Sequence, residues 1–386
     1  MISSAQWGAY NKAVESIVEG SRRALEAELT EWVDGHPGAG TAEIRREAER
    51  MMRGRVQEAD KAAASLAAQW YDAQGKAAGM RLDRAVTSVA FDEATVERVA
   101  HYQAQKLEDG DIPGFVEMCS ELVGNDAVRS LNATIMRNAA RDKRKGVKFA
   151  RVTSGRNTCP WCLMLAGRGA VYHTRESAGA MGQFHRHCSC KIVPSFSGDR
   201  YEVLVEGRDP KKIESRLIDI ERITGTRRGS AEFGREVELR DPDWLFGDEP
   251  PAVNKERGAK PLPKEREAAN VLAENGVPVM FIKEVNKTGV KSPDAFLGQD
   301  KWEFKVPGGW SKPDERSVAG EHTIRKQFYK ALDKGTSKLL LSNGCCDASF
   351  SEMVNVASKV LKSGDYAIDE VLVVAPETGE IRRLKK

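Results

Sequence analysis

The first 145 residues carry apolar side chains at helical spacing. Apolar positions recur every three or four residues, and charged side chains occupy the remaining positions of the same stretches. A proline–glycine break at residues 36–38 separates the first two stretches. The pattern predicts a mainly helical N-terminal module suited to partner contacts. The predicted helices cover residues 6–33, 41–70, 93–106 and 125–141.

The pattern changes after residue 145. Short apolar segments, VKFARV and CKIVPSF, are punctuated by glycine, cysteine and histidine, which predicts a small Cys/His-rich α+β segment. Residues 201–255 are charged, irregular and rich in proline, as in a linker. We therefore predict a module at 1–200, a linker at 201–255 and a further domain at 256–386.

The C-terminal domain has a regular order of elements. A helix ends at Gly276, an expected C-terminal stop, and strands then alternate with two more helices. The order α-β-β-β-α-β predicts an α/β domain around a mixed central sheet, so the fold class is multidomain. The predicted helices are 264–275, 321–333 and 349–361, and the predicted strands are 277–282, 294–297, 301–306, 338–342 and 371–375.

Composition changes this picture little. Hydrophobic residues make up 40% and charged residues 30%, and the net charge of +3 neither requires nor excludes a nucleic-acid partner. The N-terminus lacks the basic and apolar order of a secretion signal, and no apolar run is long enough to span a bilayer. We expect synthesis and folding in the cytoplasm and no membrane partner.

The strand at residues 302–306 places a carboxylate beside an ammonium group. Side chains alternate between faces, so Trp302 and Phe304 form a core face while Glu303 and Lys305 share the other. A hairpin through residues 298–300 would bring Asp294 next to Glu303. Glu267, on the preceding helix, is a further candidate carboxylate.

Two carboxylates and a lysine on one face suit phosphodiester hydrolysis. Carboxylate oxygens bind Mg²⁺ or Mn²⁺, the ion polarises the phosphate, and the lysine stabilises developing charge. The plainer alternatives are a weak exposed ion pair of Glu303 with Lys305, a turn role for Asp294 and an exposed helix position for Glu267.

A second candidate site combines cysteine with histidine. The chain has seven cysteines, of which Cys159 and Cys162 form one close pair and Cys188 and Cys190 another, with His185 and His187 beside the second. Such spacing predicts a structural zinc held by four of these six residues, and which histidine binds is left open. The alternative is a group of reduced, buried cysteines.

The pattern PD–x8–E-x-K, preceded by a helix with a glutamate, resembles the PD-(D/E)XK nuclease superfamily, which shares an αβββαβ core. Residues 260–386 look more specifically like the tRNA nuclease domains of CdiA-type contact-dependent inhibition toxins, on the segments EREAANVLAENGVPV, KSPDAF, KWEFKVPGG and IRKQFYKALDKG. The resemblance implies metal-dependent RNA cleavage, a tRNA substrate and a cognate immunity protein. It places the family's acidic and lysine positions on Glu267, Asp294, Glu303 and Lys305. Glu265 competes with Glu267, which we prefer because it begins an ExAxxLAxxG pattern.

Residues 1–200 carry another resemblance. CPWCLMLAGRGAVYHT and FHRHCSCKIVPSF look like the MuF-type minor capsid, or head morphogenesis, proteins of tailed phages. In that family the segment usually ends in a sequence like HPNCRC. Here it reads HRHCSC, so it is left open which of its two histidines corresponds to the histidine of the family. The resemblance implies association with portal and capsid proteins and transport in the virion.

Together these features predict a phage or prophage minor capsid protein with a C-terminal toxin nuclease. It would be made in the cytoplasm of the producing cell, carried in the virion and active in the cytoplasm of the target cell. Three other readings stay open: a DNA endonuclease with the same core, a structural capsid protein with an inactive nuclease domain, and a zinc-dependent nucleic-acid-binding module.

Overall fold

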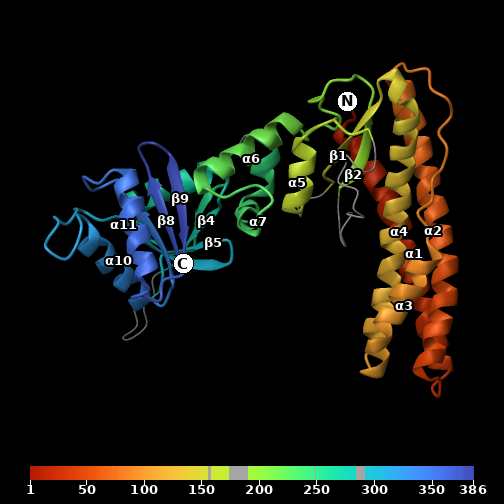
Figure 1. Ribbon diagram of the computed structural model, residues 1–386, viewed down its shortest axis with the longest axis horizontal. Helices are drawn as coiled ribbons and strands as arrows, with labels where there is room; N and C mark the ends of the chain where they lie inside the picture. The colour runs from red at the N-terminus through yellow and green to blue at the C-terminus, as the bar shows by residue number, and fades with distance from the viewer. Residues whose placement is uncertain (155–157, 174–189, 248, 284–291) are drawn as a thin grey trace. The chain divides into compact units, whose positions relative to one another are not determined.

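The computed structural model describes residues 1–154, 158–173, 190–247, 249–283 and 292–386 (Figure 1). These residues form two compact units. One contains Met1–Thr158 and Cys162–Lys211, and the other contains Cys159–Trp161 and Lys212–Lys386. The expected multidomain organisation is confirmed.

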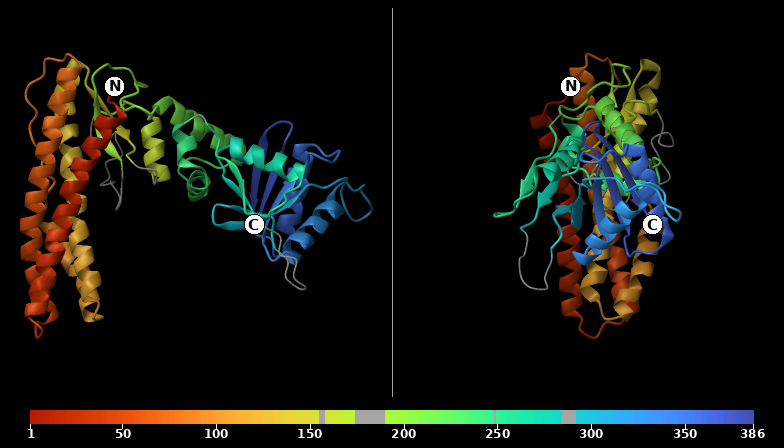
Figure 2. Two further views of the ribbon diagram at one scale, coloured as in Figure 1. Left: turned by 180° about the vertical axis from the view of Figure 1, so that it is seen from behind. Right: turned by 90° about the vertical axis from the view of Figure 1, so that its left-hand side faces the viewer.

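Four long helices make up most of the described part of the first unit, which confirms the predicted mainly helical N-terminus. Figures 1 and 2 show α1, α2 and α4 side by side, and α4 is buried along most of its length. It begins well before the predicted residue 125, because the Asp111 carboxylate accepts a hydrogen bond from the Gly114 N–H at 2.9 Å and caps its first turn. The helices are α1 (Ser4–Gly35), α2 (Thr41–Ala77), α3 (Glu93–Glu108) and α4 (Ile112–Arg141).

A small α+β segment follows the helices, as predicted. After a 3₁₀ turn, η1 (Asp142–Lys145), strand β1 (Lys148–Val152) pairs antiparallel with β2 (Lys191–Ser195). Helix α5 (Pro160–Gly167) lies between them in the chain. The Tyr172 hydroxyl donates to the Leu165 carbonyl at 2.8 Å and ties this helix to the segment that follows it.

Residues 80–91 cross the first unit as an extended strap without regular secondary structure. Side chains four residues apart on α4 bind backbone groups two residues apart on the strap. Ser130 accepts from the Ala90 N–H at 2.6 Å, Thr134 from Ser88 at 2.9 Å and Asn138 from Val86 at 3.0 Å. These side chains replace the missing strand partner, because each buried N–H needs an acceptor.

A buried carboxylate lies beside this polar row. Asp60 on α2 is fully buried, and burial together with the charge of Asp126 raises its pKa to about 7. In the unfolded chain the carboxyl would titrate near its ordinary value of 3.8. The folded protein therefore holds a proton that the unfolded chain has already lost, and stability falls as the pH rises from about 4 to about 7.

Replacing Asp60 with asparagine is expected to stabilise the first unit at pH 8 by about 2–4 kcal/mol, because the buried charge is removed. The gain should shrink toward zero at pH 4, where the native carboxyl is already neutral. Thermal melting followed by helical circular dichroism at both pH values measures the effect. Glu58→Gln, an exposed carboxylate on the same helix, is the control. An equal change at both pH values would contradict the assignment.

The second unit is a mixed sheet between two helical layers, and the predicted C-terminal mixed sheet is confirmed. Its strand order is β3-β4-β5-β6-β7-β8-β9, with parallel pairs at β3–β4, β6–β7 and β7–β8. The strands are β3 (Val253–Lys255), β4 (Val279–Phe281), β5 (Ala295–Leu297), β6 (Asp300–Lys305), β7 (Lys338–Ser342), β8 (Glu370–Ala375) and β9 (Glu380–Lys385).

Helices cover both faces of this sheet. Helix α9 (Pro263–Glu274) packs its alanine and leucine side chains on a core with Trp302 and Phe304. Helices α10 (Glu321–Asp333) and α11 (Phe350–Ser363) pack on a separate core that includes Leu339 and Leu341. On β6, Trp302 and Phe304 belong to the first of these cores, as the predicted alternation requires, and on β7 Leu340 belongs to the first core and Leu339 and Leu341 to the second.

The predicted linker at 201–255 is wrong. Most of it forms α6 (Pro210–Thr224), α7 (Ala231–Glu238), α8 (Pro242–Phe246) and strand β3, all belonging to the second unit from residue 212 onward. The Asp241 N–H donates to the Gly276 carbonyl at 2.7 Å, and the Trp244 indole donates to the Glu274 carbonyl at 3.2 Å. These bonds close the C-terminal end of α9, so the segment is part of the domain.

Candidate active site

The β5–β6 hairpin positions the predicted acidic residues. Ala295 pairs with Trp302 and Leu297 with Asp300, and Gly298 turns the chain with φ of +61°, a left-handed conformation that favours glycine. Asp294 directly precedes β5, and its N–H donates to the Trp302 carbonyl at 3.1 Å. The hairpin therefore brings Asp294 beside the strand that carries Glu303 and Lys305, as predicted.

Asp294, Glu303 and Lys305 form one polar cluster. The Lys305 ammonium donates to Glu303 Oε1 and to the Phe304 carbonyl at 3.0 Å, and it lies 3.7 Å from Asp294 Oδ2. Asp294 Oδ2 also accepts from the Phe304 N–H at 2.8 Å. The lysine is thus committed to the two carboxylates, and the Asp294 side chain is fixed by the backbone of β6.

Glu303 is a carboxylate in a dry environment. It is fully buried, and burial followed by the charge of Asp294 raises its pKa to about 7, while Lys305 acts in the opposite direction. Within the described residues its Oε2 atom is buried without a hydrogen-bond partner. A buried carboxylate oxygen without a donor is costly, and a cation bound at this oxygen would remove that cost.

The helix carboxylate at this site is Glu265, which corrects the choice of Glu267. Burial raises the pKa of Glu265, and the hydrogen bond that its Oε2 accepts from the Leu262 N–H at 2.8 Å lowers it. The charges of Asp294 and Lys305 also act on this carboxyl, the first raising its pKa and the second lowering it. Glu267 is exposed. Residues two positions apart on a helix lie about 200° apart around its axis, so both cannot face the sheet. The ExAxxLAxxG pattern does not specify which side of the helix faces the sheet, so it could not separate Glu265 from Glu267.

A second lysine reaches the same end of β6. Lys264 precedes Glu265 on the first turn of α9, and its ammonium donates to the Val306 carbonyl at 3.4 Å. Its charge also lowers the pKa of Glu265, against the effect of burial. Sequence reasoning missed Lys264, although its position beside the competing glutamate was a usable signal.

The acidic cluster fits a divalent ion of the hard, oxygen-binding type. Among the described residues, no three His, Cys, Asp or Glu side chains form a ready metal shell. Mg²⁺ needs fewer protein ligands than that, because it keeps waters and is commonly held by one or two carboxylates plus substrate phosphate. The unpartnered Glu303 oxygen and the nearby Asp294 carboxylate match this requirement.

The structure brings together part of the predicted cysteine cluster. The Sγ atoms of Cys162 and Cys190 lie 3.4 Å apart, and both side chains are buried. Arg151 on β1 contacts both of them, which the sequence did not indicate. Cys159 is half-buried, and His185, His187 and Cys188 lie outside the described residues.

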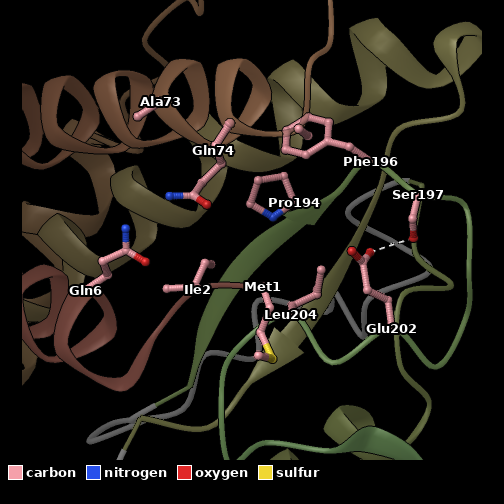
Figure 3. Close-up of a pocket in the computed structure, with 12 residues that line it drawn as sticks. Met1, Ile2, Gln6, Ala73, Gln74, Pro194, Phe196, Ser197, Glu202 and Leu204 are labelled. Carbon is pink, nitrogen blue, oxygen red and sulfur yellow. Dashed lines mark hydrogen bonds between the residues drawn. The ribbon is translucent and has the colours of Figure 1, made fainter.

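The first unit also contains a pocket of about 390 Å³ (Figure 3). Its lining mixes apolar side chains such as Ile2 and Phe196 with the amide Gln74 and the carboxylate Glu202. Glu202 Oε2 already accepts from the hydroxyls of Ser195 and Ser197, each at 2.7 Å. Its carboxylate serves to hold the chain after β2, so the pocket offers no evident reactive group.

None of the helices in the described part of the chain is long and apolar enough to cross a membrane.

Comparison with known proteins finds a family for the N-terminal part of the chain. A protein-family model described as VG15 protein matches residues 1–218. The Gene 15 protein of Mycobacterium phage D29 is 28% identical over 81 residues, which is 14% of this chain and 30% of that relative. The chain thus matches less than a third of the relative's length.

A structural comparison finds the CdiA-CT/CdiI toxin and immunity complex from Burkholderia pseudomallei. The match has 16% identity and a TM-score of 0.27, and it covers 34% of this chain and 99% of that one. A score this low supports no conclusion. The family model spans more than half of the 386 residues, and the chain therefore belongs to the VG15 protein family, with a phage protein among its relatives.

Proposed function

We propose that the second unit is a metal-dependent nuclease of the PD-(D/E)XK type, carried by a phage minor capsid protein of MuF type. The observation that carries this proposal is the convergence of Asp294, Glu303 and Lys305 on one cluster, with a buried Glu303 oxygen left without a donor. A merely structural ion pair would have no reason to bury that oxygen unsatisfied.

Each charged residue of the cluster has its own proposed role. Asp294 and Glu303 would hold Mg²⁺ or Mn²⁺, and Glu265 is the α9 carboxylate whose pKa responds to the charges of Asp294 and Lys305. The bound ion supplies Lewis-acid polarisation of the phosphate and a more acidic water. Lys305 would keep the carboxylates in place and stabilise charge developing on the phosphate oxygens. Burial of Glu303 excludes bulk water and strengthens each of these interactions.

RNA is the proposed substrate, and tRNA the first choice. The support is the resemblance of residues 260–386 to CdiA-type tRNA nuclease domains, which also implies a cognate immunity protein. The first unit would attach the nuclease to portal or capsid proteins, as the resemblance of residues 1–200 to MuF-type minor capsid proteins implies. The competing candidates are a DNA endonuclease and a structural protein with an inactive domain.

The test uses the purified full chain with Mg²⁺ or Mn²⁺, incubated with tRNA or with supercoiled plasmid. We expect tRNA fragments that disappear when EDTA is added. Cleavage of plasmid but not tRNA would establish the DNA endonuclease instead. Intact tRNA and plasmid with both metals would reject the nuclease and favour the structural protein.

Lys264 gives a prediction about phosphate binding. Lys264 lies at the end of β6, outside the pair of Lys305 with Glu303, and is a second cation able to contact a substrate phosphate. Lys264→Ala is expected to reduce the slope of log Kd against log salt by about 0.7 to 0.9, the values for one lost phosphate contact on single-stranded and duplex nucleic acid. The Kd for tRNA is measured over a series of salt concentrations, with Ca²⁺ in place of Mg²⁺.

Arg266→Ala is the matched control, since Arg266 is an exposed cation on the opposite side of the same helix. Lys264→Arg should restore the slope, because the charge is kept. Identical slopes for wild type and Lys264→Ala would contradict the assigned contact.

A further inference from the structure

A row of three side chains crosses the sheet beside the acidic cluster, and the roles proposed above do not use it. Met280 on β4 pairs with Phe296 on β5, and Phe296 pairs with Lys301 on β6. Successive side chains of a strand alternate between faces, so Lys301 shares the face of β6 that carries Glu303 and Lys305. The Met280–Phe296–Lys301 row therefore lies on the same face of the sheet as the cluster.

This row faces away from the core under α9. The alternate residues of β4 and β5 belong to that core. Met280 is 38% exposed, Lys301 is exposed and Phe296 is half-buried. The solvated face of antiparallel strands is normally polar. Two adjacent apolar side chains, one of them aromatic, therefore reach solvent at positions where polar residues are expected.

The third member of the row is a cation that is open to a phosphate. The Lys301 ammonium lies 5.7 Å from the centre of the Phe296 ring, as in a cation–π contact. Its neighbour Lys305 pairs with Glu303, whereas Lys301 has no carboxylate partner in the described part of the second unit. A lysine ammonium on its flexible stem can turn from the ring to a phosphate.

The row lies about one nucleotide from the proposed metal site. Two residues along a strand span about 7 Å, which separates Lys301 from Glu303 along β6. A substrate phosphate bound at Glu303 through the metal ion would bring the base of a neighbouring nucleotide over the row. An aromatic side chain on a sheet stacks on an unpaired base, whereas a base inside a duplex has both faces covered by its neighbours.

We propose that the Met280–Phe296–Lys301 row is a binding platform for an unpaired nucleotide of the RNA substrate, next to the cleaved phosphate. The base stacks on Phe296, Met280 extends the apolar surface, and Lys301 binds a phosphate of the same strand. The inference rests on the proposed nuclease function and narrows its substrate to RNA with an unpaired segment at the cleaved bond.

The experiment compares single-stranded with duplex RNA. Binding to the full chain is measured with Ca²⁺ in place of Mg²⁺, by fluorescence anisotropy of a labelled adenosine oligonucleotide, alone or paired with a uridine oligonucleotide. Phe296→Leu keeps an apolar side chain and removes the ring, so we expect single-strand binding about 10-fold weaker than in wild type. Phe296→Tyr keeps the ring and should bind as wild type. Duplex binding should be equal in all three proteins.

Tyr329→Leu is the matched control, because Tyr329 on α10 is an aromatic side chain of the same unit and is 68% exposed. Its binding to both RNAs should equal that of wild type. Melting temperatures establish that each variant is folded.

Lys301→Ala tests the platform independently should Phe296→Leu not fold, since Lys301 is exposed. On the single strand it should reduce the slope of log Kd against log salt by about 0.7, the value for one lost phosphate contact. Lys301→Arg should restore the slope, because the charge is kept. Lys326→Ala, at an exposed position of α10, is the charge control and should leave the slope unchanged.

Two results would overturn the platform. One is equal single-strand affinity of wild type and Phe296→Leu. The other is an equal loss on single strand and duplex, which would show that the ring does not select an unpaired base.

Cleavage decides the nuclease proposal separately. A wild-type chain that cleaves tRNA, together with normal single-strand binding by Phe296→Leu, keeps the nuclease and rejects the platform. A wild-type chain that cleaves neither tRNA nor plasmid, together with weakened single-strand binding by Phe296→Leu, rejects the nuclease and keeps the row as a surface for unpaired RNA.

Discussion

Glu303→Gln is expected to lower metal-dependent RNA cleavage by about 1,000-fold. The substitution removes one of the two carboxylates proposed to hold the ion, and metal stabilisation of the transition state amounts to several kcal/mol, with about 1.4 kcal/mol for each tenfold in rate. Single-turnover cleavage of tRNA by the full chain, with Mg²⁺ at saturation, measures the loss.

The same substitution separates catalysis from folding. Because burial raises the pKa of Glu303, its ionised form is unfavourable in the folded protein, so a neutral glutamine of equal shape should not lower the melting temperature at pH 8. Activity should fall while stability holds or rises. If Glu303 served only to pair with Lys305, the substitution should lower the melting temperature and leave cleavage unchanged.

Two glutamates on α9 provide the matched comparison. Glu265→Gln, at the site, should reduce cleavage by about 10-fold, the low end of the effect seen for residues that orient metal ligands. Glu267→Gln, exposed on the same helix, should leave it unchanged. Equal rates for wild type and Glu303→Gln would reject the assigned site, and a loss confined to Glu267→Gln would restore the original choice.

The strand part of this site was predictable because it depends on local alternation. The motif around residues 302–306 specifies which side chains share a face, and the turn at Gly298 fixes the hairpin register. The helix part was not, because Glu265 and Glu267 both fit the motif and only the packing of α9 on the sheet decides which one faces β6.

The misassigned linker has a different cause. Residues 201–255 have the charge and proline content of a solvated segment, yet several of those charges pair with one another inside the second unit. Composition shows only how many charges a segment has. Whether those charges join a buried ion-pair network depends on partners far along the chain, which composition does not reveal. Arg383 on β9, which binds Glu236 on α7, is separated from it by well over a hundred residues.

The strap of residues 80–91 was missed for a related reason. Its apolar residues do not recur at helix or strand spacing. Its backbone hydrogen-bond partners are the side chains of Ser130, Thr134 and Asn138 on α4. Polar residues at every fourth position of a largely buried helix were the available signal. A buried row of that kind needs a partner with free backbone N–H groups, which an extended segment provides.

Removal of the Glu236 carboxylate is expected to lower the free energy of unfolding of the second unit by about 3–5 kcal/mol, because buried cations lose their partner. Glu236 lies 3.3 Å from Arg240 Nη1 and 2.7 Å from Arg383 Nε, and its side chain is 2% exposed. Burial already lowers the pKa of Arg240, and the Glu236 charge opposes that effect. Without Glu236, both guanidinium groups would remain in a dry site near each other.

Urea unfolding of Glu236→Ala, followed by amide hydrogen exchange of peptides from β8 and β9, measures this loss in the second unit alone. Glu238→Ala, at an exposed position of the same helix, should shift the transition by less than about 0.5 kcal/mol. Arg383 also binds Glu370 at 2.6 Å, so a damaged network should first release β9 from β8. Equal stability of the two variants would mean that α7 is not held by these charges, and the segment would again qualify as a linker.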